Sequence, residues 1–178
     1  MARHAYPPTD KLPQRLQEEL RKRVGPDRGN VWKMLMWAES MVPSFIDFND
    51  AVRYKTALTL HLRELIILRV GHLCGAAYEV HHHTRIAREE GMSENLIAAA
   101  GVGPQASGLD ATHRVALDLT DDLVSDKKAS DVNFAKAIEA FGPSVLAEIV
   151  LLVGCYVMAC MYLKTFEIDI EQPQPRAP

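Results

Sequence analysis

The longest apolar run in the chain, IVLLVGCYVMACMYL at Ile149–Leu163, most strongly limits what the sequence can fold into. It is shorter than the roughly 20 residues that a helix needs to span a bilayer. Glu148 and Lys164 also close the run on both sides. A helix that is apolar nearly all round is buried on every side. We therefore expect a buried helix, of the kind found at a subunit interface, rather than a membrane segment.

Leu60–Leu73 forms a second run that is apolar nearly all round, and a small domain has difficulty burying two such helices alone. Alternating strand patterns are almost absent, whereas helical periodicity is widespread. The pattern predicts an oligomeric, single-domain, all-α bundle. We expect an arm and first helix at 1–29, a helical domain at 30–170 and a flexible tail at 171–178. The expected helices are 13–24, one from 30, 44–57, 60–73, 76–90, one capped by Ser93, 110–124, 130–141 and 143–166, with breaks at Gly25-Pro26, Gly75, Gly91 and Gly142-Pro143.

Composition narrows the range of partners and compartments. The 178 residues are 48% hydrophobic, which is enough for one domain with a core. The net charge of −3 and the lack of a basic stripe argue against nucleic acid as a partner. The N-terminus has no apolar signal-peptide region, and the three cysteines form no CxxC pair. We therefore expect reduced thiols, a cytoplasmic location, no membrane association and a small-molecule partner.

The stretch CGAAYEVHHH, Cys74–His83, concentrates side chains that can do chemistry. Stepping about 100° per residue along the predicted helix puts His83 on the apolar stripe and Glu79 beside it, within i,i+4 reach. Tyr78, His81 and His82 fall on the opposite, polar face, where we expect the two histidine side chains to be solvated. Three adjacent helical positions diverge, so the three histidines do not converge on one ion. We expect no metal, although a site using Glu79, His83 and a ligand from another helix stays open.

Glu64 is a carboxylate within the apolar helix that precedes this stretch. A carboxylate there either pairs with a cation, such as Arg63 or Arg69, or has a raised pKa. Gly71 on the same face permits close approach of the following helix, which would bring His83 towards Glu64. In that arrangement Glu64 would fix the orientation and tautomer of the imidazole, and His83 would move a proton.

The phrase RELIILRVG, followed by YE and by a histidine shortly before RIAREEGMSE, resembles the core of the carboxymuconolactone decarboxylase and alkylhydroperoxidase D superfamily. The resemblance extends to the C-terminal helix LVGCYVMACMYLKTF and covers roughly residues 30–170. It implies an oligomeric helical bundle of the alkylhydroperoxidase D (AhpD) type, built as dimers, trimers or hexamers.

The peroxidase branch of that superfamily has a motif of Glu, eleven residues, Cys, two residues, Cys, three residues and His. Laid on this sequence, its Glu falls on Glu64 and its His on His83, but Ala76 and Glu79 stand where the two cysteines belong. Peroxide chemistry of that kind needs an attacking and a resolving thiol. The chain therefore resembles the branch that lacks the CxxC pair, the decarboxylase type.

That resemblance implies a carboxy-lyase of aromatic catabolism whose catalytic residues are Glu64, Glu79 and His83. The name-giving reaction removes carbon dioxide from 4-carboxymuconolactone and uses no cofactor, because the substrate delocalises its own negative charge. His83 would carry the proton, Glu64 would orient it, and Glu79 would be a second acid–base group or would destabilise the substrate carboxylate. Apolar surroundings would raise the carboxylate pKa values towards neutrality.

Several assignments around this site stay open. Cys74, Tyr78 and Tyr156 are candidates to line the substrate pocket, with packing as the alternative for both tyrosines. Lys164 and Arg69 are candidates to bind a substrate carboxylate. The same residues would also serve isomerisation, lactone opening or retro-aldol cleavage. Two other functions compete: a thiol antioxidant protein that uses Cys74, and a non-enzymatic ligand-binding or assembly protein.

Overall fold

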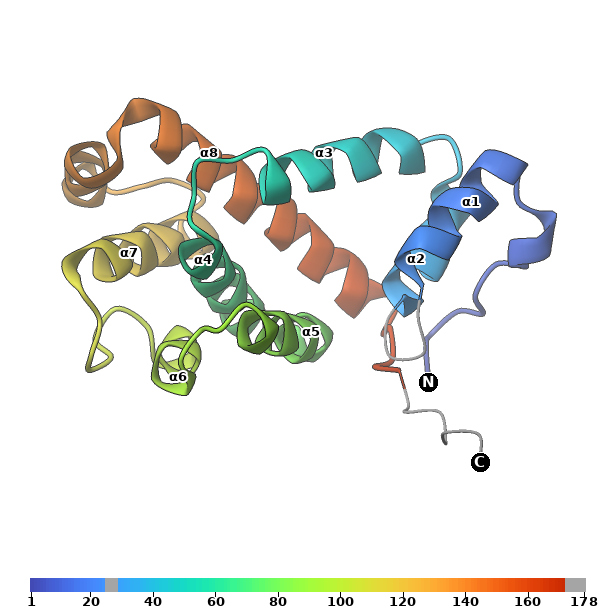
Figure 1. Ribbon diagram of the computed structural model, residues 1–178, viewed down its shortest axis with the longest axis horizontal. Coiled ribbons are helices and arrows are strands. Elements are labelled where there is room, and N and C mark those ends of the chain that lie inside the picture. Colours follow the sequence, from blue (N-terminus) through green and yellow to red (C-terminus); the bar gives the residue numbers. More distant parts are fainter. Residues whose placement is uncertain (25–28, 172–178) are drawn as a thin grey trace. The chain divides into compact units, whose positions relative to one another are not determined.

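The computed structural model describes residues 1–24 and 29–171, and within these residues it contains eight α-helices and no strand (Figure 1). The predicted all-α class is therefore confirmed. The expected break at Gly25-Pro26 and nearly all of the expected tail lie outside the described residues. The helices are α1 (Gln14–Arg23), α2 (Asn30–Leu35), α3 (Val42–Tyr54), α4 (Leu60–Leu73), α5 (Ala77–Glu89), α6 (Glu94–Val102), α7 (Ala111–Ser125) and α8 (Asp131–Thr165), with short 3-10 helices at Thr9–Lys11 and Met36–Ala38.

Local side-chain chemistry explains where several of these helices begin and bend. Thr59, Ser93 and Asp110 each accept a hydrogen bond from a backbone N–H in the first turn of α4, α6 and α7. Gly142 interrupts α8 with φ 72° and ψ 170°, a conformation that favours glycine, and Pro143 follows it. The break predicted at Gly142-Pro143 is therefore present as a kink inside α8.

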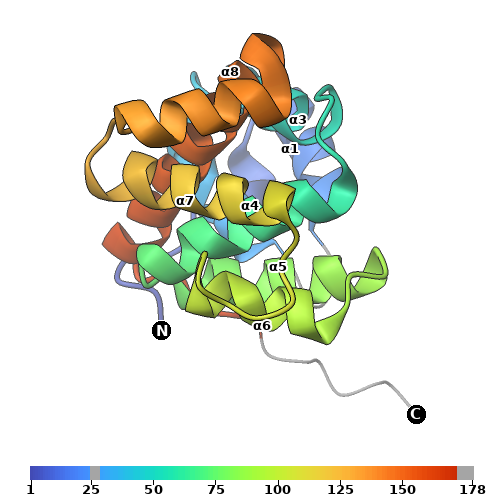
Figure 2. The same ribbon diagram turned by 90° about the vertical axis from the view of Figure 1, so that its left-hand side faces the viewer.

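The described chain divides into two compact units, and the candidate site lies in the one that covers Asp50–Met161. In this unit α4 is central and packs against α5, α6 and α7. Figures 1 and 2 show α7 alongside α4, with α5 and α6 on one side of α4 and the first half of α8 on the other. The main core cluster joins α4, α7 and α8 through residues such as Ile66, Ile67, Leu119, Ile149 and Leu152, which are 0% exposed.

The other unit consists of Met1–Asn49 and Tyr162–Pro178, as far as these are described. Its core combines Leu12, Leu16 and Leu20 with Met36, Val42 and Ile46. The N-terminal segment is fastened to the segment after α8, because Ala2 N and Tyr6 OH both donate to Asp169 Oδ1. The N-terminal arm is thus an integral part of this unit.

Helix α8 departs from the expectation that it is buried on every side. Ile149, Leu152, Tyr156 and Cys160 are buried on one side, whereas the other side is exposed. By length and composition α8 would suit a membrane span, but a helix packed into a protein core passes the same test. The exposed apolar side chains are Val150, Leu151, Met158 and Met161.

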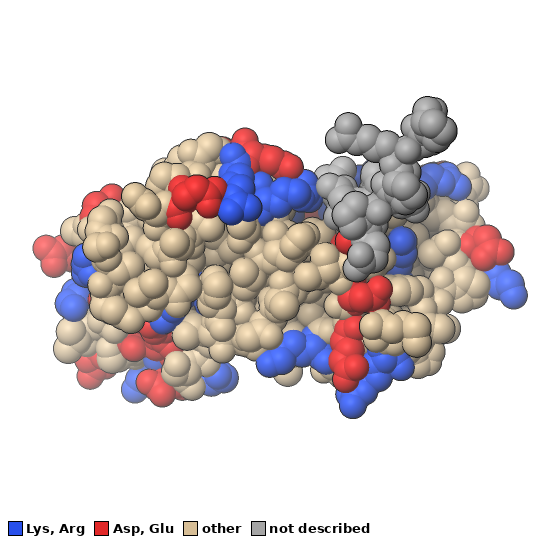
Figure 3. Space-filling view, turned by 90° about the horizontal axis from the view of Figure 1, so that it is seen from below, with Lys and Arg blue, Asp and Glu red and all other residues tan. Residues whose placement is uncertain are grey.

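Charged side chains of both signs are interspersed on the face shown in Figure 3, with tan areas between them. The view therefore shows no single extended basic area on that face.

Candidate functional site

A close contact between α4 and α5 builds the site. A Cβ atom added at Gly71 of α4 would lie 3.1 Å from Val80 Cγ2 and 3.5 Å from Glu79 Cβ, both on α5. Only glycine leaves room for this approach without a shift of the neighbours. The approach predicted at Gly71 is confirmed, and it brings the Glu79 and His83 side of α5 against Glu64.

The three candidate acid–base residues form a chain of contacts, in which His83 lies between Glu64 and Glu79. His83 Nδ1 is 2.5 Å from Glu64 Oε2, and His83 Nε2 is 3.2 Å from Glu79 Oε1. Glu64 is 0% exposed and His83 is 6% exposed. The predicted contact between Glu64 and His83 is therefore confirmed, and each ring nitrogen of His83 faces a carboxylate.

Arg63 completes the support of Glu64. It is 2% exposed, and its Nε donates to Glu64 Oε1 at 3.1 Å. Its two terminal nitrogens donate to Glu90 Oε1 at 2.7 Å and to the backbone carbonyl of Arg53 at 2.9 Å. The sequence left two alternative partners for Glu64, an arginine or His83. Both partners contact the same carboxylate.

This arrangement fixes the charge state of the buried pair. Burial alone would lower the pKa of His83, but the charges and hydrogen bonds of Glu64 and Glu79 outweigh it and raise the pKa to about 9. Burial alone would raise the pKa of Glu64, yet His83, Arg53 and Arg63 hold it below its usual value. The expectation of a raised pKa is therefore wrong for Glu64, because its cations overcome desolvation.

Tyr156 of α8 is the second aromatic group of the site. Its ring meets the His83 ring edge-on, with the centroids 5.2 Å apart. Burial, together with Glu79 and Glu64, raises the pKa of the Tyr156 phenol well above its usual value, although Arg53 opposes the shift. The Tyr156 phenol is therefore uncharged at neutral pH, and its ring packs against the imidazole of His83.

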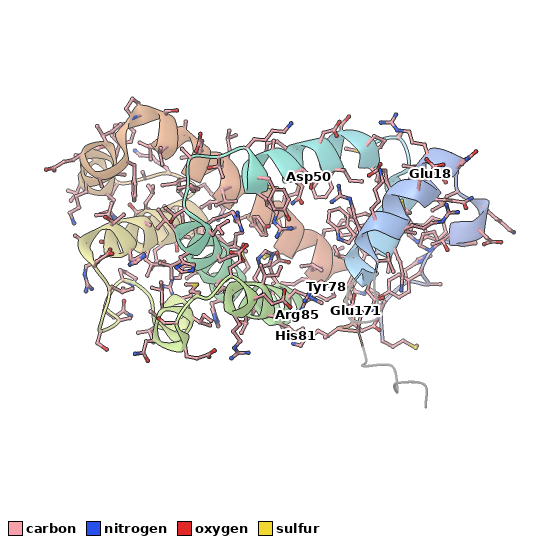
Figure 4. All side chains as sticks on the ribbon, in the orientation of Figure 1. Glu18, Asp50, Tyr78, His81, Arg85 and Glu171 are labelled. Atoms are coloured by element: carbon pink, nitrogen blue, oxygen red, sulfur yellow. The ribbon has the colours of Figure 1, made fainter. Side chains whose placement is uncertain are left out.

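Tyr78 and His82 depart from the helical-wheel prediction. Both were expected on the polar face of α5, yet they are 7% and 8% exposed. Their rings lie 4.3 Å apart, and the His81 ring meets His82 edge-on at 5.1 Å. Figure 4 shows that Tyr78, His81 and Arg85 all project from α5. The structure thus groups Tyr78 with His82, whereas His81 is exposed as expected.

The cysteines sit in packing environments. Cys74 ends α4, is partly buried and packs against the main core cluster. Cys155 and Cys160 are buried in that cluster, and none of the three cysteines forms a disulfide. Among the described residues no group of three or more His, Cys, Asp or Glu side chains is arranged to hold a metal ion.

Of the two cations expected to bind a substrate carboxylate, Arg69 is engaged by other groups. Arg69 donates to both oxygens of Asp121, at 2.6 and 2.7 Å, and to the carbonyls of Ala100 and Gly101. Its guanidinium therefore ties α4 to α6 and α7. Lys164 belongs to the other compact unit.

Arg53, which the sequence did not single out, is a further cation whose charge acts on the site. Its charge affects the pKa values of Glu64 and Tyr156. Burial alone would lower the pKa of Arg53, but Tyr156 and Tyr54, followed by Glu64 and Glu79, raise it above its usual value. It lies near the end of α3, a position with no periodic or motif signal that points to chemistry. Only the fold reveals its role.

One cavity of about 680 Å³ lies at α6, the following loop and the start of α7. Ser93, Gln105, Asp110 and His113 are among its polar lining residues. Glu64, Glu79 and His83 do not line it. It is thus separate from the acid–base residues, which are defined by their mutual contacts and not by this cavity.

Comparisons with known proteins bear on the family and on the fold. Residues 41–122, a little under half of the chain, match the sequence model of the carboxymuconolactone decarboxylase family. This segment contains Glu64, Glu79 and His83. No curated protein matches the sequence.

Solved structures with the same fold include three bacterial proteins of low sequence identity. One from Ralstonia eutropha JMP134, described as an alkylhydroperoxidase AhpD core and an uncharacterized peroxidase-related protein, is 18% identical, with a TM-score of 0.82 over 95% of this chain and 92% of that one. An uncharacterized peroxidase-related protein from Silicibacter sp. TM1040 is 17% identical, with a TM-score of 0.82 over 95% and 91%. A protein of unknown function from Agrobacterium tumefaciens, described as a candidate AhpD antioxidant defence protein, is 19% identical, with a TM-score of 0.72 over 76% and 94%.

At these identities the structures establish the fold alone, and the sequence match covers less than half of the chain. Residues 41–122 therefore resemble the carboxymuconolactone decarboxylase family, and the chain has the AhpD-like helical fold.

Proposed function

We propose that this protein is a cofactor-independent acid–base enzyme of the carboxymuconolactone decarboxylase type. It would be a carboxy-lyase that acts on a small lactone or carboxylic acid from aromatic catabolism. The observation that carries the proposal is the line of Glu64, His83 and Glu79, in which both ring nitrogens of a buried histidine face carboxylates. The match of residues 41–122 to the model of the carboxymuconolactone decarboxylase family supports the reaction class.

The charge state of His83 suits it to the role of acid. With a pKa of about 9, the imidazole is protonated at neutral pH and holds a proton on each nitrogen. Glu64 accepts the Nδ1 proton and keeps the ring in place. The Nε2 proton points towards Glu79, whose side chain is 10% exposed, so this end of the line would exchange the proton with the substrate.

The chemistry then needs one bond broken and one formed. Cleavage of the carbon–carbon bond to the carboxylate releases carbon dioxide and leaves its electron pair delocalised onto the lactone carbonyl. A proton from His83, passed directly or through Glu79, forms the new carbon–hydrogen bond. Neutral His83 regains a proton from water.

Carbon dioxide release from 4-carboxymuconolactone tests this function. The native protein should release it, and His83→Ala should lower kcat by about 10²–10⁴-fold, the usual contribution of a positioned acid–base group. Glu79→Gln is a second variant, chosen because the amide has nearly the size and shape of the carboxylate but cannot carry its charge. Equal turnover by the native protein and both variants would contradict the assigned roles, and no release by the native protein would exclude this substrate.

A thiol-based antioxidant activity is the second candidate. The compared structures are described as AhpD or peroxidase-related proteins, and Cys74 is a partly exposed cysteine outside any disulfide. Against it, Ala76 and Glu79 stand where a CxxC pair would lie, so no resolving thiol is present at that spacing. Peroxide consumption that disappears in Cys74→Ser would support this candidate, whereas equal consumption by both proteins would exclude it.

A further inference from the structure

Arg53 is fastened to the acid–base site through its backbone. Its carbonyl accepts a hydrogen bond from Arg63, whose Nε holds Glu64 Oε1. The end of α3 that carries Arg53 is therefore tied to the residue that orients His83. A change confined to the Arg53 side chain leaves this tether in place.

The guanidinium of Arg53 is held in position but incompletely satisfied. It stacks over the Tyr54 ring at 4.9 Å from the centroid, and its Nε is buried without a hydrogen-bond acceptor. A buried donor of a charged group without an acceptor costs free energy. An anion that reaches this guanidinium would remove that cost and gain a charge-assisted hydrogen bond.

The other arginines near the site are already committed. All three donor groups of Arg63 that the structure records go to Glu64, Glu90 and the Arg53 carbonyl. Arg69 holds Asp121 and two carbonyl groups. Arg53 is thus the cation whose charge acts on Glu64, Glu79 and Tyr156 and whose Nε still lacks an acceptor.

We propose that Arg53 binds a carboxylate of the substrate and holds it beside Glu79 and His83. This inference rests on the proposed function and narrows it to substrates that are organic anions. The bound carboxylate is one that persists through the reaction. An ion pair with the departing carboxylate would stabilise the ground state more than the transition state and would oppose catalysis.

Binding of an unreactive ring carboxylate tests the assignment without turnover. The probe is 2-furoate, and its neutral amide, 2-furamide, has the same ring without the charge. Titration calorimetry should show 2-furoate binding to the native protein, and Arg53→Gln should weaken it about 10-fold or more. Arg53→Lys keeps the charge but loses the planar fork, so it should restore part of the affinity. 2-Furamide should bind the native protein and Arg53→Gln equally.

Arg88→Gln is the matched control, because Arg88 lies on the exposed side of α5 and pairs with Glu94. It should leave 2-furoate binding unchanged. The proposal is overturned if the native protein does not bind 2-furoate, or if Arg53→Gln binds it as tightly as the native protein. Circular dichroism of each variant verifies that the helices are intact.

The two proposals fail in different ways. If 2-furoate binding depends on Arg53 but no lactone is decarboxylated, the anion site stands and the proposed reaction falls. If carbon dioxide is released and Arg53→Gln changes neither KM nor 2-furoate affinity, the reaction stands and the role of Arg53 falls. A higher KM at similar kcat in Arg53→Gln supports both.

Discussion

At the scale of single residues, the site is a balanced cluster of buried charge. Three cations and three carboxylates act on one another, so the positive and negative charges of the cluster offset one another. Glu64 is the centre, because it accepts from Arg63 through one oxygen and from His83 through the other. The members are Arg53, Arg63, His83, Glu64, Glu79 and Glu90.

Removal of one member should therefore be costly. Arg63→Met removes the cation that donates to both Glu64 and Glu90, and we expect the free energy of unfolding to fall by roughly 3–5 kcal/mol. Urea denaturation followed by circular dichroism measures the loss. Arg88→Met, which removes an arginine from the exposed side of α5, should change stability little. A similar small effect for both variants would show that the buried network does not stabilise the fold.

Stability should also depend on pH through His83. Its pKa is raised in the folded protein to about 9, from an ordinary value near 6.5. The protonated ring therefore contributes stability that is fully present below about pH 6.5 and is lost as the pH rises through about 9. The melting temperature of the native protein should fall over that interval, and less so in Glu64→Gln. A melting temperature that rises from pH 6.5 to 9 in the native protein would contradict this contribution.

At the scale of helices, the contact at Gly71 decides whether the site forms. Gly71→Ala would place a Cβ 3.1 Å from Val80 Cγ2, so we expect α5 to shift and stability to fall by about 1–3 kcal/mol. Gly101→Ala in α6 is the matched control, since its nearest neighbour is the exposed ring of His72, which can rotate away. Thermal unfolding compares the two. A gain of stability in Gly71→Ala would show that the helices are not closely packed there.

The helices themselves could be predicted from the sequence, because their signals are local. The helix Leu60–Leu73 was predicted with the observed bounds. The N-cap at Ser93 and the kink at Gly142-Pro143 follow from the types of the residues at the helix start and at the break. The pairing of Glu64 with His83 also followed, since the glycine that permits it lies on the same helix face.

The remaining features depend on contacts between distant segments. Tyr78 and His82 are buried although their helical positions predict a solvated face. Arg53 reaches the site from the end of another helix, and no pattern along the sequence marks it. The lowered pKa of Glu64 needs the positions of Arg53, Arg63 and His83 together, which only the folded chain provides.

At the scale of the whole molecule, α8 supports the prediction that the protein is an oligomer. Its exposed side carries Val150, Leu151, Met158 and Met161, which are 42–65% exposed. A run of exposed apolar side chains on one helix is typical of an interaction surface. We expect light scattering to give at least twice the mass of the chain, and the double variant Leu151→Asp, Met158→Asp to be a monomer. A monomeric native protein would rule out an oligomer under these conditions.

The central claim, that His83 is a buried acid held between two carboxylates, is tested most directly by an NMR titration of its imidazole. Isotope labelling of histidine and comparison with His83→Ala assign the signal. We expect a pKa of about 9 in the native protein and a clearly lower one in Glu64→Gln, because burial then acts without its main opposing charge. A native pKa at or below 6.5 would mean that His83 is neutral at physiological pH, and it would contradict the role of His83 as the proton donor.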